Sequence, residues 1–339
     1  MQTQHFRVFA LFLVCLSGSL ASQAQVPQTM QAIQIQQFGG PEVLTLHEIF
    51  TPQPAADELL VRVHAAGVNP VDTGARSGRS AALTNAVLPY IPGFDVSGVV
   101  VSAGSAVSGF SAGDPVYAML DLRRGGGYAE YALVKESEAA RKPENLTFAE
   151  AAALPLVSLT AWQALFDTAD LQAGQTVLIH GGAGGVGSIA VQLARWRGAR
   201  VIATGSDYSQ EFLRELGADV TVDYRNQRFE DFAVNVDVVL DTVGRDTQVR
   251  SLGVLREGGI LVSIVGLVPE ARNPPPGIRA QSILVRANGP QLVQLGNLLA
   301  EGVINPVVSF RFPLSAAPEA HRQSETRSTR GKIVLAIEP

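Results

Sequence analysis

The stretch "VLIHGGAGGVGSIAVQLAR", Val177 to Arg195, predicts a buried strand, a glycine turn and a helix in immediate succession. Its glycines at 182, 184 and 187 match the pattern G-x-G-x-x-G. The pattern alone is a weak signal, but its place directly after a strand and at the start of a helix makes it meaningful. We expect Gly182 to allow the tight turn, Gly184 to let backbone N–H groups approach a pyrophosphate, and Gly187 to let the helix pack close to the strand.

The ligand expected on this turn is a dinucleotide. Free amide groups at the start of the helix and the positive end of the helix dipole together bind a pyrophosphate. The predicted pyrophosphate site comprises Gly182, Ala183, Gly184, Gly185, Val186 and Gly187.

The nature of the dinucleotide is predicted from the end of the next strand. NAD-binding chains place an Asp or Glu there to bind the ribose hydroxyls. Here the strand ends at Thr204, Gly205 and Ser206, and Asp207 comes slightly late. Small hydroxyl and glycine positions tolerate a 2′-phosphate, which an acid would repel, so NADP(H) is favoured over NAD. After the third strand, Tyr224 supplies a phenol hydroxyl and Arg225 supplies a positive charge for such a phosphate. Arg225 is equally consistent with a solvated surface residue.

From residue 175 onward, strands and helices alternate along the chain. Short connections between them predict a doubly wound parallel sheet. The predicted strands are 176–180, 200–205, 219–224, 237–244, 259–266 and 281–286, with helices at 186–197, 209–216 and 246–256.

The preceding region, residues 32–134, reads differently. Short Val-, Ile- and Leu-rich runs are broken by Gly, Pro, Asn and Asp every eight to twelve residues, which predicts a β-barrel or sandwich. A helical stretch then begins at Thr147, a predicted N-cap with Glu150 three residues on. Near the C-terminus, "VVSFRF" and "GKIVLAI" are strands expected to return to the β domain, since the parallel sheet is already complete.

Composition excludes several classes of protein. The chain has 339 residues, of which 46% are apolar and 17% charged, and its net charge of −5 argues against nucleic-acid binding. No stretch after residue 25 has the length and apolarity of a membrane span. The single cysteine, Cys15, lies near the N-terminus, and the histidines that follow it lack metal-ligand spacing, so no metal is expected.

Residues 1–24 have the pattern of a secretory signal peptide. Arg7 precedes an apolar run from about Val8 to Leu16, and the small residues Ser22 and Ala24 suit a signal peptidase. This predicts a periplasmic or secreted protein. The alternative is translation from Met30, which would make the protein cytoplasmic and would avoid the scarcity of NADPH expected outside the cell.

Over nearly all of residues 30–339, the chain resembles the zinc-free quinone oxidoreductase and enone reductase family of the medium-chain dehydrogenase/reductase superfamily. The resemblance rests on "FGGPEVL", "AAGVNPVDTGARSG", "LPYIPGFDVSGVV", "GGGYAEYALV", "AALPLVSLTAWQALFD", "HGGAGGVGSIAVQLAR", "DVVLDTVG" and "RGKIVLAI". It implies a GroES-like β-barrel domain at 25–150 completed by 288–339, and a Rossmann NADP-binding domain at 151–287. It also implies hydride transfer from NADPH to a quinone or an α,β-unsaturated carbonyl without a metal.

The resemblance also implies site residues. Asn69 matches a position near the nicotinamide and the substrate carbonyl, where it would donate to the oxygen that gains charge. Thr160 matches a position bordering the nicotinamide, Ser206 and Tyr224 match positions beside the adenosine phosphate, and Lys332 matches a lysine that contacts the cofactor. The rival interpretations are a turn-forming Asn69 and an ordinary surface Lys332.

Two departures from the family pattern concern specificity and proton donation. Tyr208 stands where many relatives have a lysine, which weakens the NADP prediction. Gly74 stands where many have an aromatic residue, so the proton donor is left open among water, Thr73 and Tyr90. Tyr90 and Phe94 are predicted either as substrate-cleft walls or as core residues. Asp72 is interpreted either as a helix cap or as a group that takes part in the chemistry. His180, at the end of a buried strand, is interpreted as a packing residue.

Two alternative functions remain from the sequence: an enoyl-thioester reductase, and a dinucleotide-binding sensor or structural protein with little catalysis. The edge strand "QSILVR" of the predicted parallel sheet offers weak support for pairing across a two-fold axis. The family resemblance makes a homodimer the expected assembly.

Overall fold

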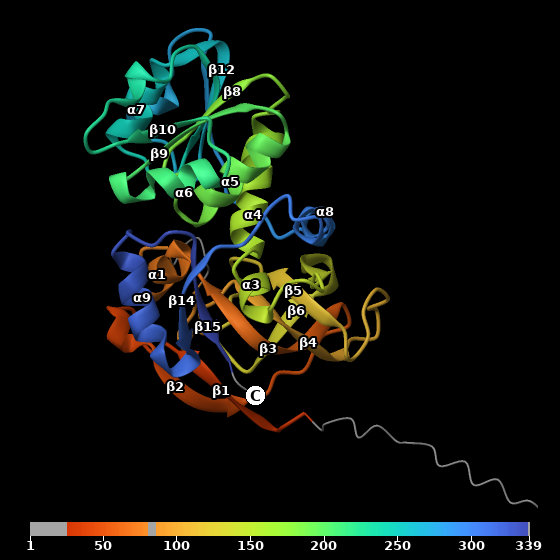
Figure 1. Ribbon diagram of the computed structural model, residues 1–339. Helices are drawn as coiled ribbons and strands as arrows, with labels where there is room; N and C mark the ends of the chain where they lie inside the picture. The colour runs from red at the N-terminus through yellow and green to blue at the C-terminus, as the bar shows by residue number, and fades with distance from the viewer. Residues whose placement is uncertain (1–25, 81–85, 338–339) are drawn as a thin grey trace, which may run out of the picture.

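The structure is a computed structural model that describes residues 26–80 and 86–337. It comprises a Rossmann part and a β-rich part, with α4 (Pro155–Trp162) running between them (Figure 1). The predicted signal peptide lies outside the described residues. Within the described residues, no helix is long and apolar enough to cross a bilayer.

The Rossmann part is built on a parallel sheet in the order β10-β9-β8-β11-β12-β13. The order reverses at β8, so a crevice forms at the carboxyl end of that strand, where doubly wound folds bind their ligands. The prediction of a doubly wound sheet is confirmed. The strands are β8 (Thr176–Ile179), β9 (Arg200–Gly205), β10 (Val220–Asp223), β11 (Val236–Asp241), β12 (Leu255–Ser263) and β13 (Arg279–Ser282), and the helices are α5 (Gly185–Trp196), α6 (Gln210–Glu215) and α7 (Asp246–Leu252).

The edge strand of this sheet lies earlier in the chain than predicted. The prediction placed it at 281–286, but β13 ends at Ser282. Ile283 and Val285 instead pack against the large apolar cluster that extends into the β-rich part. Burial of these side chains therefore ends the strand and turns the chain toward α8 (Gly289–Ala300).

The β-rich part contains a sheet in the order β14-β15-β3-β4-β5-β7, with β6 paired to β3 and a separate β1–β2 pair. Both C-terminal strands return to this part, as predicted, and β15 pairs antiparallel with β3. The strands are β1 (Thr29–Gln34), β2 (Thr45–Phe50), β3 (Glu58–Val68), β4 (Asp95–Ala103), β5 (Pro115–Met119), β6 (Tyr131–Lys135), β7 (Ala139–Arg141), β14 (Val308–Pro313) and β15 (Lys332–Ala336).

Helices connect and cover this part. Thr147 caps α3 (Phe148–Ala152) in a capping box with Glu150, as predicted. The predicted domain boundary at residue 150 falls inside α3, which contacts β3 and β4. The remaining helices are α1 (Pro70–Arg76), α9 (Ala317–Glu325), a π-helix at Gln163–Thr168, and 3₁₀ turns at Pro41–Val43, Glu136–Glu138, Asp207–Ser209, Phe229–Asp231, Pro269–Arg272 and Leu314–Ala316.

One apolar core spans both parts. Phe94 and Met119 of the β-rich part lie in the same buried cluster as Leu159 of α4, Ile189 of α5 and Leu292 of α8. This shared core fixes the two parts relative to each other, and the junction between them lies beside the carboxyl end of β8.

Candidate active site

The glycine turn follows β8 and leads directly into α5. Gly181 has φ +66°, a left-handed conformation that favours glycine. The tight turn therefore depends on Gly181, which the spacing pattern does not include, in addition to the predicted Gly182. Gly182 is required for a different reason, because a Cβ there would lie 2.9 Å from Leu213 Cδ2 and 3.0 Å from Ala203 Cβ.

The other two glycines have the predicted geometry. A Cβ on Gly184 would meet only the Gly181 carbonyl oxygen, at 3.4 Å, so this face of the turn is open to a ligand. A Cβ on Gly187 would lie 2.2 Å from the same oxygen, which shows how closely α5 packs on the turn. Among the described side chains, none caps the N-terminus of α5. Its first amides are therefore available to a pyrophosphate, and the turn fits a dinucleotide.

The C-terminal segment of the β-rich part lies on this turn. The Gly331 amide donates to the Ala183 carbonyl at 2.9 Å, and Gly331 forms a β-bridge with Gly184. The neighbouring Lys332 packs its aliphatic stem here, since its Cδ is 3.0 Å from the place of a Gly185 Cβ. The aliphatic part of the lysine that was predicted to contact the cofactor therefore lies beside the glycine turn.

The ammonium group of Lys332 points into the β-rich part. Its Nζ donates to the Val68 carbonyl at 2.8 Å and also to Asn69 Oδ1. In turn, Asn69 Nδ2 donates to Asp95 Oδ2 at 2.9 Å, and Lys332 Nζ lies 3.8 Å from the same oxygen. All three side chains are buried, so the interpretation of Lys332 as a surface residue was wrong. We call Asn69, Asp72, Asp95 and Lys332 the buried polar network.

Asp72 joins the network as a helix cap. Its Oδ2 accepts from the Asn69 amide at 2.7 Å in the capping box of α1, and its Oδ1 accepts from the Gly93 amide at 3.0 Å. This confirms the capping interpretation of Asp72. The cap also fixes the backbone of Asn69, so a turn-forming role and a site role coexist in that residue.

Burial dominates the electrostatics of the network. It raises the pKa of Asp72 to about 7, helped by the like charge of Asp95, and it raises the pKa of Asp95 to about 6. Burial also lowers the pKa of Lys332, against the attraction of Asp95 and Asp72. Two carboxyl groups share one ammonium group, so the network takes up a proton close to neutral pH.

The two predicted threonines make local bonds. Thr160 Oγ1 donates to the Leu156 carbonyl at 2.6 Å within α4, and Thr73 Oγ1 donates to the Pro70 carbonyl at 2.8 Å within α1. A hydroxyl has a single hydrogen, so neither has one left to donate in this arrangement. Whether they contact the cofactor stays a prediction, as does substrate contact by Asn69.

The predicted adenosine-side residues lie at neighbouring strand ends. Ser206 follows β9, is 7% exposed, and its Oγ lies 3.1 Å from Ser209 Oγ. The Tyr224 amide donates to the Gly205 carbonyl at 3.1 Å, which brings the exposed Tyr224 next to Ser206. Tyr208 serves another purpose, because its hydroxyl donates to the Ser328 carbonyl at 2.7 Å and so anchors the C-terminal loop.

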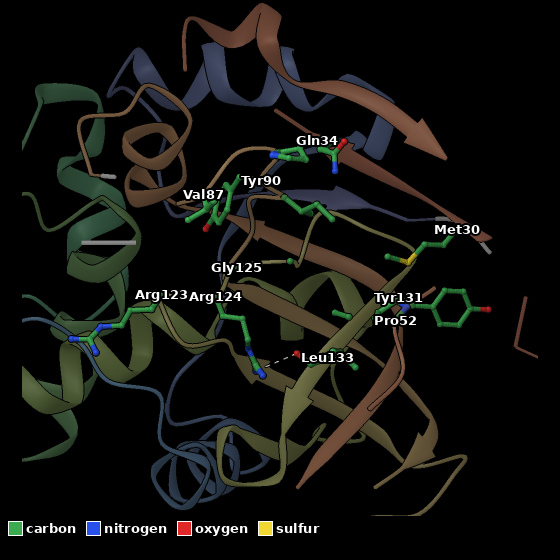
Figure 2. A pocket seen from close by; sticks show the side chains of 14 residues that line it. Met30, Gln34, Pro52, Val87, Tyr90, Arg123, Arg124, Gly125, Tyr131 and Leu133 are labelled. Atoms are coloured by element: carbon green, nitrogen blue, oxygen red, sulfur yellow. Dashed lines mark hydrogen bonds between the residues drawn. The ribbon is translucent and has the colours of Figure 1, made fainter. Parts of the chain in front are cut away.

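A hollow of about 410 Å³ lies beside the glycine loop of the β-rich part (Figure 2). Tyr90 lines it together with Val87, Arg123 and Gly125, and the Tyr90 hydroxyl finds no hydrogen-bond partner among the described residues. Burial raises the pKa of Tyr90 and keeps it protonated. Phe94, in contrast, is 0% exposed within the shared core, so its assignment as a cleft wall was wrong.

His180 is buried, its Nε2 lies 2.9 Å from Ser251 Oγ, and burial lowers its pKa to about 4. This agrees with the prediction of a packing role. Within residues 26–80 and 86–337, no group of three or more His, Cys, Asp or Glu side chains is arranged to hold a metal ion.

Asp95 is the site residue that the sequence analysis missed. The only local signal is an acid at the start of an apolar strand, in "GFDVSGVV". A charged residue is almost never fully buried without a partner, so a buried Asp95 requires a charged or hydrogen-bonding partner elsewhere in the chain. The partners Asn69 and Lys332 lie far away in the chain, and no local pattern points to them.

Comparison with known proteins agrees with the fold and the site. Two family models match, described as "Alcohol dehydrogenase GroES-like domain" over residues 55–144 and "Zinc-binding dehydrogenase" over residues 216–335. A chloroplastic NADPH-dependent alkenal/one oxidoreductase of Arabidopsis thaliana is 38% identical over 328 residues, which cover 94% of this chain and 82% of that relative.

Solved structures give the same result. The quinone oxidoreductase from Coxiella burnetii is 38% identical with a TM-score of 0.85, covering 91% of this chain and 100% of that one. An Escherichia coli quinone oxidoreductase complexed with NADPH is 30% identical with a TM-score of 0.81, covering 91% and 99%.

A GroES-like barrel beside a Rossmann sheet, with a glycine turn at their junction, defines a medium-chain dehydrogenase/reductase. Within that class, the chain belongs to the quinone oxidoreductase family.

Proposed function

We propose that this protein transfers hydride from NADPH to a quinone or to the C=C bond of an α,β-unsaturated carbonyl. The observation that carries the proposal is the open glycine turn at the bare N-terminus of α5, packed against Gly331 of the other part. Relatives named as alkenal/one and quinone oxidoreductases over nearly the whole chain support the substrate class. The NADPH complex of the Escherichia coli relative supports the cofactor.

The protein's share of the mechanism is binding and positioning. Bound NADPH supplies the hydride, and the chain holds it in place. Residues 182–187 would bind the pyrophosphate through backbone amides, and Ser206 and Tyr224, at neighbouring strand ends, would hold the adenosine end. The buried polar network fixes the side chain of Asn69, which would lie beside the nicotinamide.

Proton transfer completes the reduction of a C=C bond. Thr73 is a poor donor because its hydroxyl hydrogen already binds the Pro70 carbonyl. The unpartnered hydroxyl of Tyr90 and solvent water are the remaining sources of the proton.

The test is oxidation of NADPH and of NADH by the purified protein, with a simple quinone and with a short 2-alkenal. We expect NADPH to be oxidised well above NADH with at least one acceptor. Absence of oxidation by a protein shown to be folded would contradict the proposal and favour a dinucleotide sensor. Activity confined to a long-chain enoyl thioester would favour the thioester reductase instead.

The compartment is a separate proposal. We infer that the leader at 1–24 is cleaved on export to the periplasm or beyond. In support, residues upstream of Met30 take part in the β1–β2 pair: Thr29 pairs with Phe50, and the Gln28 carbonyl accepts from the Thr51 amide at 3.0 Å. Start at Met30, with a cytoplasmic protein, is the alternative. N-terminal sequencing of the protein from the source cells distinguishes the two.

The assembly is also a proposal. We propose a homodimer in which two copies pair through β13, the edge strand of the parallel sheet. The side chains of this strand are largely exposed, so its outer backbone edge is accessible to a second copy. The Ile283 amide donates to the Ser263 carbonyl, so the alternate amide of Ser282 faces away from β12. Light scattering on Ser282→Pro, which removes this outward amide, should show a monomer where the parent protein is a dimer.

A further inference from the structure

The carboxylate of Asp95 uses both of its oxygens to join separate elements. Oδ2 accepts from Asn69 Nδ2 at 2.9 Å, at the start of α1. Oδ1 accepts from the Leu156 amide at 2.8 Å, at the start of α4. The side chain is 0% exposed, so these bonds form away from water, where losing one is costly.

The Leu156 amide is the first that α4 can offer, because Pro155 begins the helix and has no N–H. A carboxylate at this point satisfies an orphan amide and stabilises the positive end of the helix dipole. Asp95 is therefore the N-terminal anchor of α4, although it lies sixty-one residues earlier in the chain.

Helix α4 lies against the glycine turn. Val157, the residue after Leu156, has its Cγ1 3.1 Å from the place of a Gly185 Cβ. Thr160 lies one helical turn further, bonded back to the Leu156 carbonyl. A shift at the start of α4 would therefore move residues packed on the glycine turn and the residue predicted to border the nicotinamide.

Lys332 connects the same carboxylate to the turn from the opposite side. Its Nζ is 3.8 Å from Asp95 Oδ2, and its stem packs by Gly185. The preceding residue, Gly331, bonds to the Ala183 carbonyl. Helix α4 and the segment at Lys332 thus reach the glycine turn from two sides, and both contact the buried carboxylate of Asp95.

We propose that Asp95 is a positioning residue that holds Asn69, α4 and Lys332 in register with the glycine turn, so that efficient hydride transfer requires it. This rests on the proposed function, since it names a further residue for that reaction. Pyrophosphate binding depends on the turn itself, so loss of Asp95 should affect transfer far more than affinity.

Asp95→Asn is the informative variant because it keeps the shape of the side chain. A carboxamide has one acceptor oxygen and one donor NH₂, whereas this position faces N–H donors on both sides. One of the two links must fail, and Lys332 loses its nearest counter-charge. Asp114→Asn is the matched control, since Asp114 pairs with the exposed Arg141 at 2.7 Å, remote from the turn.

The experiment measures three quantities on the full chain: the NADPH dissociation constant, kcat, and the deuterium isotope effect with NADPH labelled at C4. For Asp95→Asn we expect a dissociation constant within about threefold of the parent, a kcat lower by about 10- to 100-fold, and a larger isotope effect. Asp114→Asn should match the parent in all three. Parent-like kcat and isotope effect in Asp95→Asn would overturn the proposal, as would a loss of affinity equal to the loss of rate.

Two additions keep the outcome decisive. Fluorescence of the bound nicotinamide should change in Asp95→Asn at saturating NADPH, and this readout needs no turnover. If none of the tested acceptors supports oxidation of NADPH by the parent protein, the proposed function fails. The fluorescence measurement still decides the role of Asp95 in that case. If Asp95→Asn does not fold, Asn69→Ala breaks the same link from the other end and should show the same pattern.

Discussion

The glycine turn and the buried polar network meet at the junction of the two parts, but they are built from different materials. The turn presents backbone amides, has no ionisable group, and spans a few consecutive residues after β8. The network is made of side chains from α1, β4 and β15, and its two carboxyl groups and one ammonium group are buried. The turn is suited to anchor a charged ligand at any pH. The network is suited to fix geometry, and its strength depends on protonation.

The largest effect is expected from Gly187→Ala, which tests the turn alone. The added Cβ would lie 2.2 Å from the Gly181 oxygen and 2.7 Å from Gly182 Cα, so α5 must move away from the turn. NADPH affinity should fall at least tenfold, with a stability loss of about 1–3 kcal/mol. Fluorescence titration and chemical denaturation measure both. Gly253→Ala is the control, since its Cβ would meet nothing closer than 3.5 Å, and equal effects in the two variants would contradict the role of the turn.

Ser206→Asp tests the adenosine end of the same region. It places an acid at the tip of β9, beside Tyr224. The carboxylate should repel a 2′-phosphate and accept the ribose hydroxyls of NADH. We expect the ratio of kcat/KM for NADPH to that for NADH to fall by about tenfold or more, in steady-state assays with one acceptor. An unchanged ratio would show that Ser206 does not face the 2′ position.

A pH series tests the network. The pKa of Asp72 is raised from 3.8 to about 7 and that of Asp95 to about 6, so these two groups hold more protons in the folded protein than in the unfolded chain between about pH 4 and pH 7. The buried His180 and His321, whose pKa values are lowered to about 4 and about 3, hold fewer and contribute a slope of the opposite sign. The stability that the two carboxyl groups confer is present below pH 4 and is lost as the pH rises through 6 and 7. The slope approaches about 1.4 kcal/mol per pH unit for each proton involved.

Urea denaturation at pH 5, 6 and 7 measures this slope. Because the histidines are unchanged in the variant, the difference between variant and parent isolates Asp72: with rising pH, the stability of Asp72→Asn should fall less, or rise more, than that of the parent. Asp114→Asn should leave the slope unchanged, because the Arg141 pair lowers the pKa of Asp114 and its titration lies below this range. A slope that is the same in all three proteins would mean that the network does not titrate as described.

The smallest effect is expected from Thr73→Val. The hydroxyl donates to the Pro70 carbonyl inside α1 and has no second hydrogen to give. Its removal should change kcat by less than about twofold in a steady-state assay with a 2-alkenal. A fall of 100-fold or more, the scale of a lost general acid, would restore Thr73 as the proton donor.

The contrast between the two regions also explains what the sequence could predict. The glycine pattern, the alternation of strands and helices, and the cap at Thr147 are local, so each was predicted from a short window. Gly181 was missed because the spacing pattern does not say which glycine takes the left-handed conformation. The early end of β13 was missed because Ile283 and Val285 favour a strand locally, but a distant core buries them.

The buried polar network could not be predicted from local sequence patterns. Asn69, Asp95 and Lys332 are brought together by the pairing of β3 with β4 and β15. Family resemblance pointed to Asn69 and Lys332, but not to the carboxylate between them. Phe94 was predicted as a cleft wall or as a core residue, and only the packing of distant elements around it, which no local pattern shows, decides for the core.

The most direct measurement is the fate of the hydride itself. NADPH with deuterium at both C4 positions is incubated with the protein and a 2-alkenal, and the product is analysed by mass spectrometry. Direct transfer predicts a saturated aldehyde with one deuterium at the β carbon. A product without deuterium, or consumption of NADPH with no reduced product, would contradict hydride transfer at this junction.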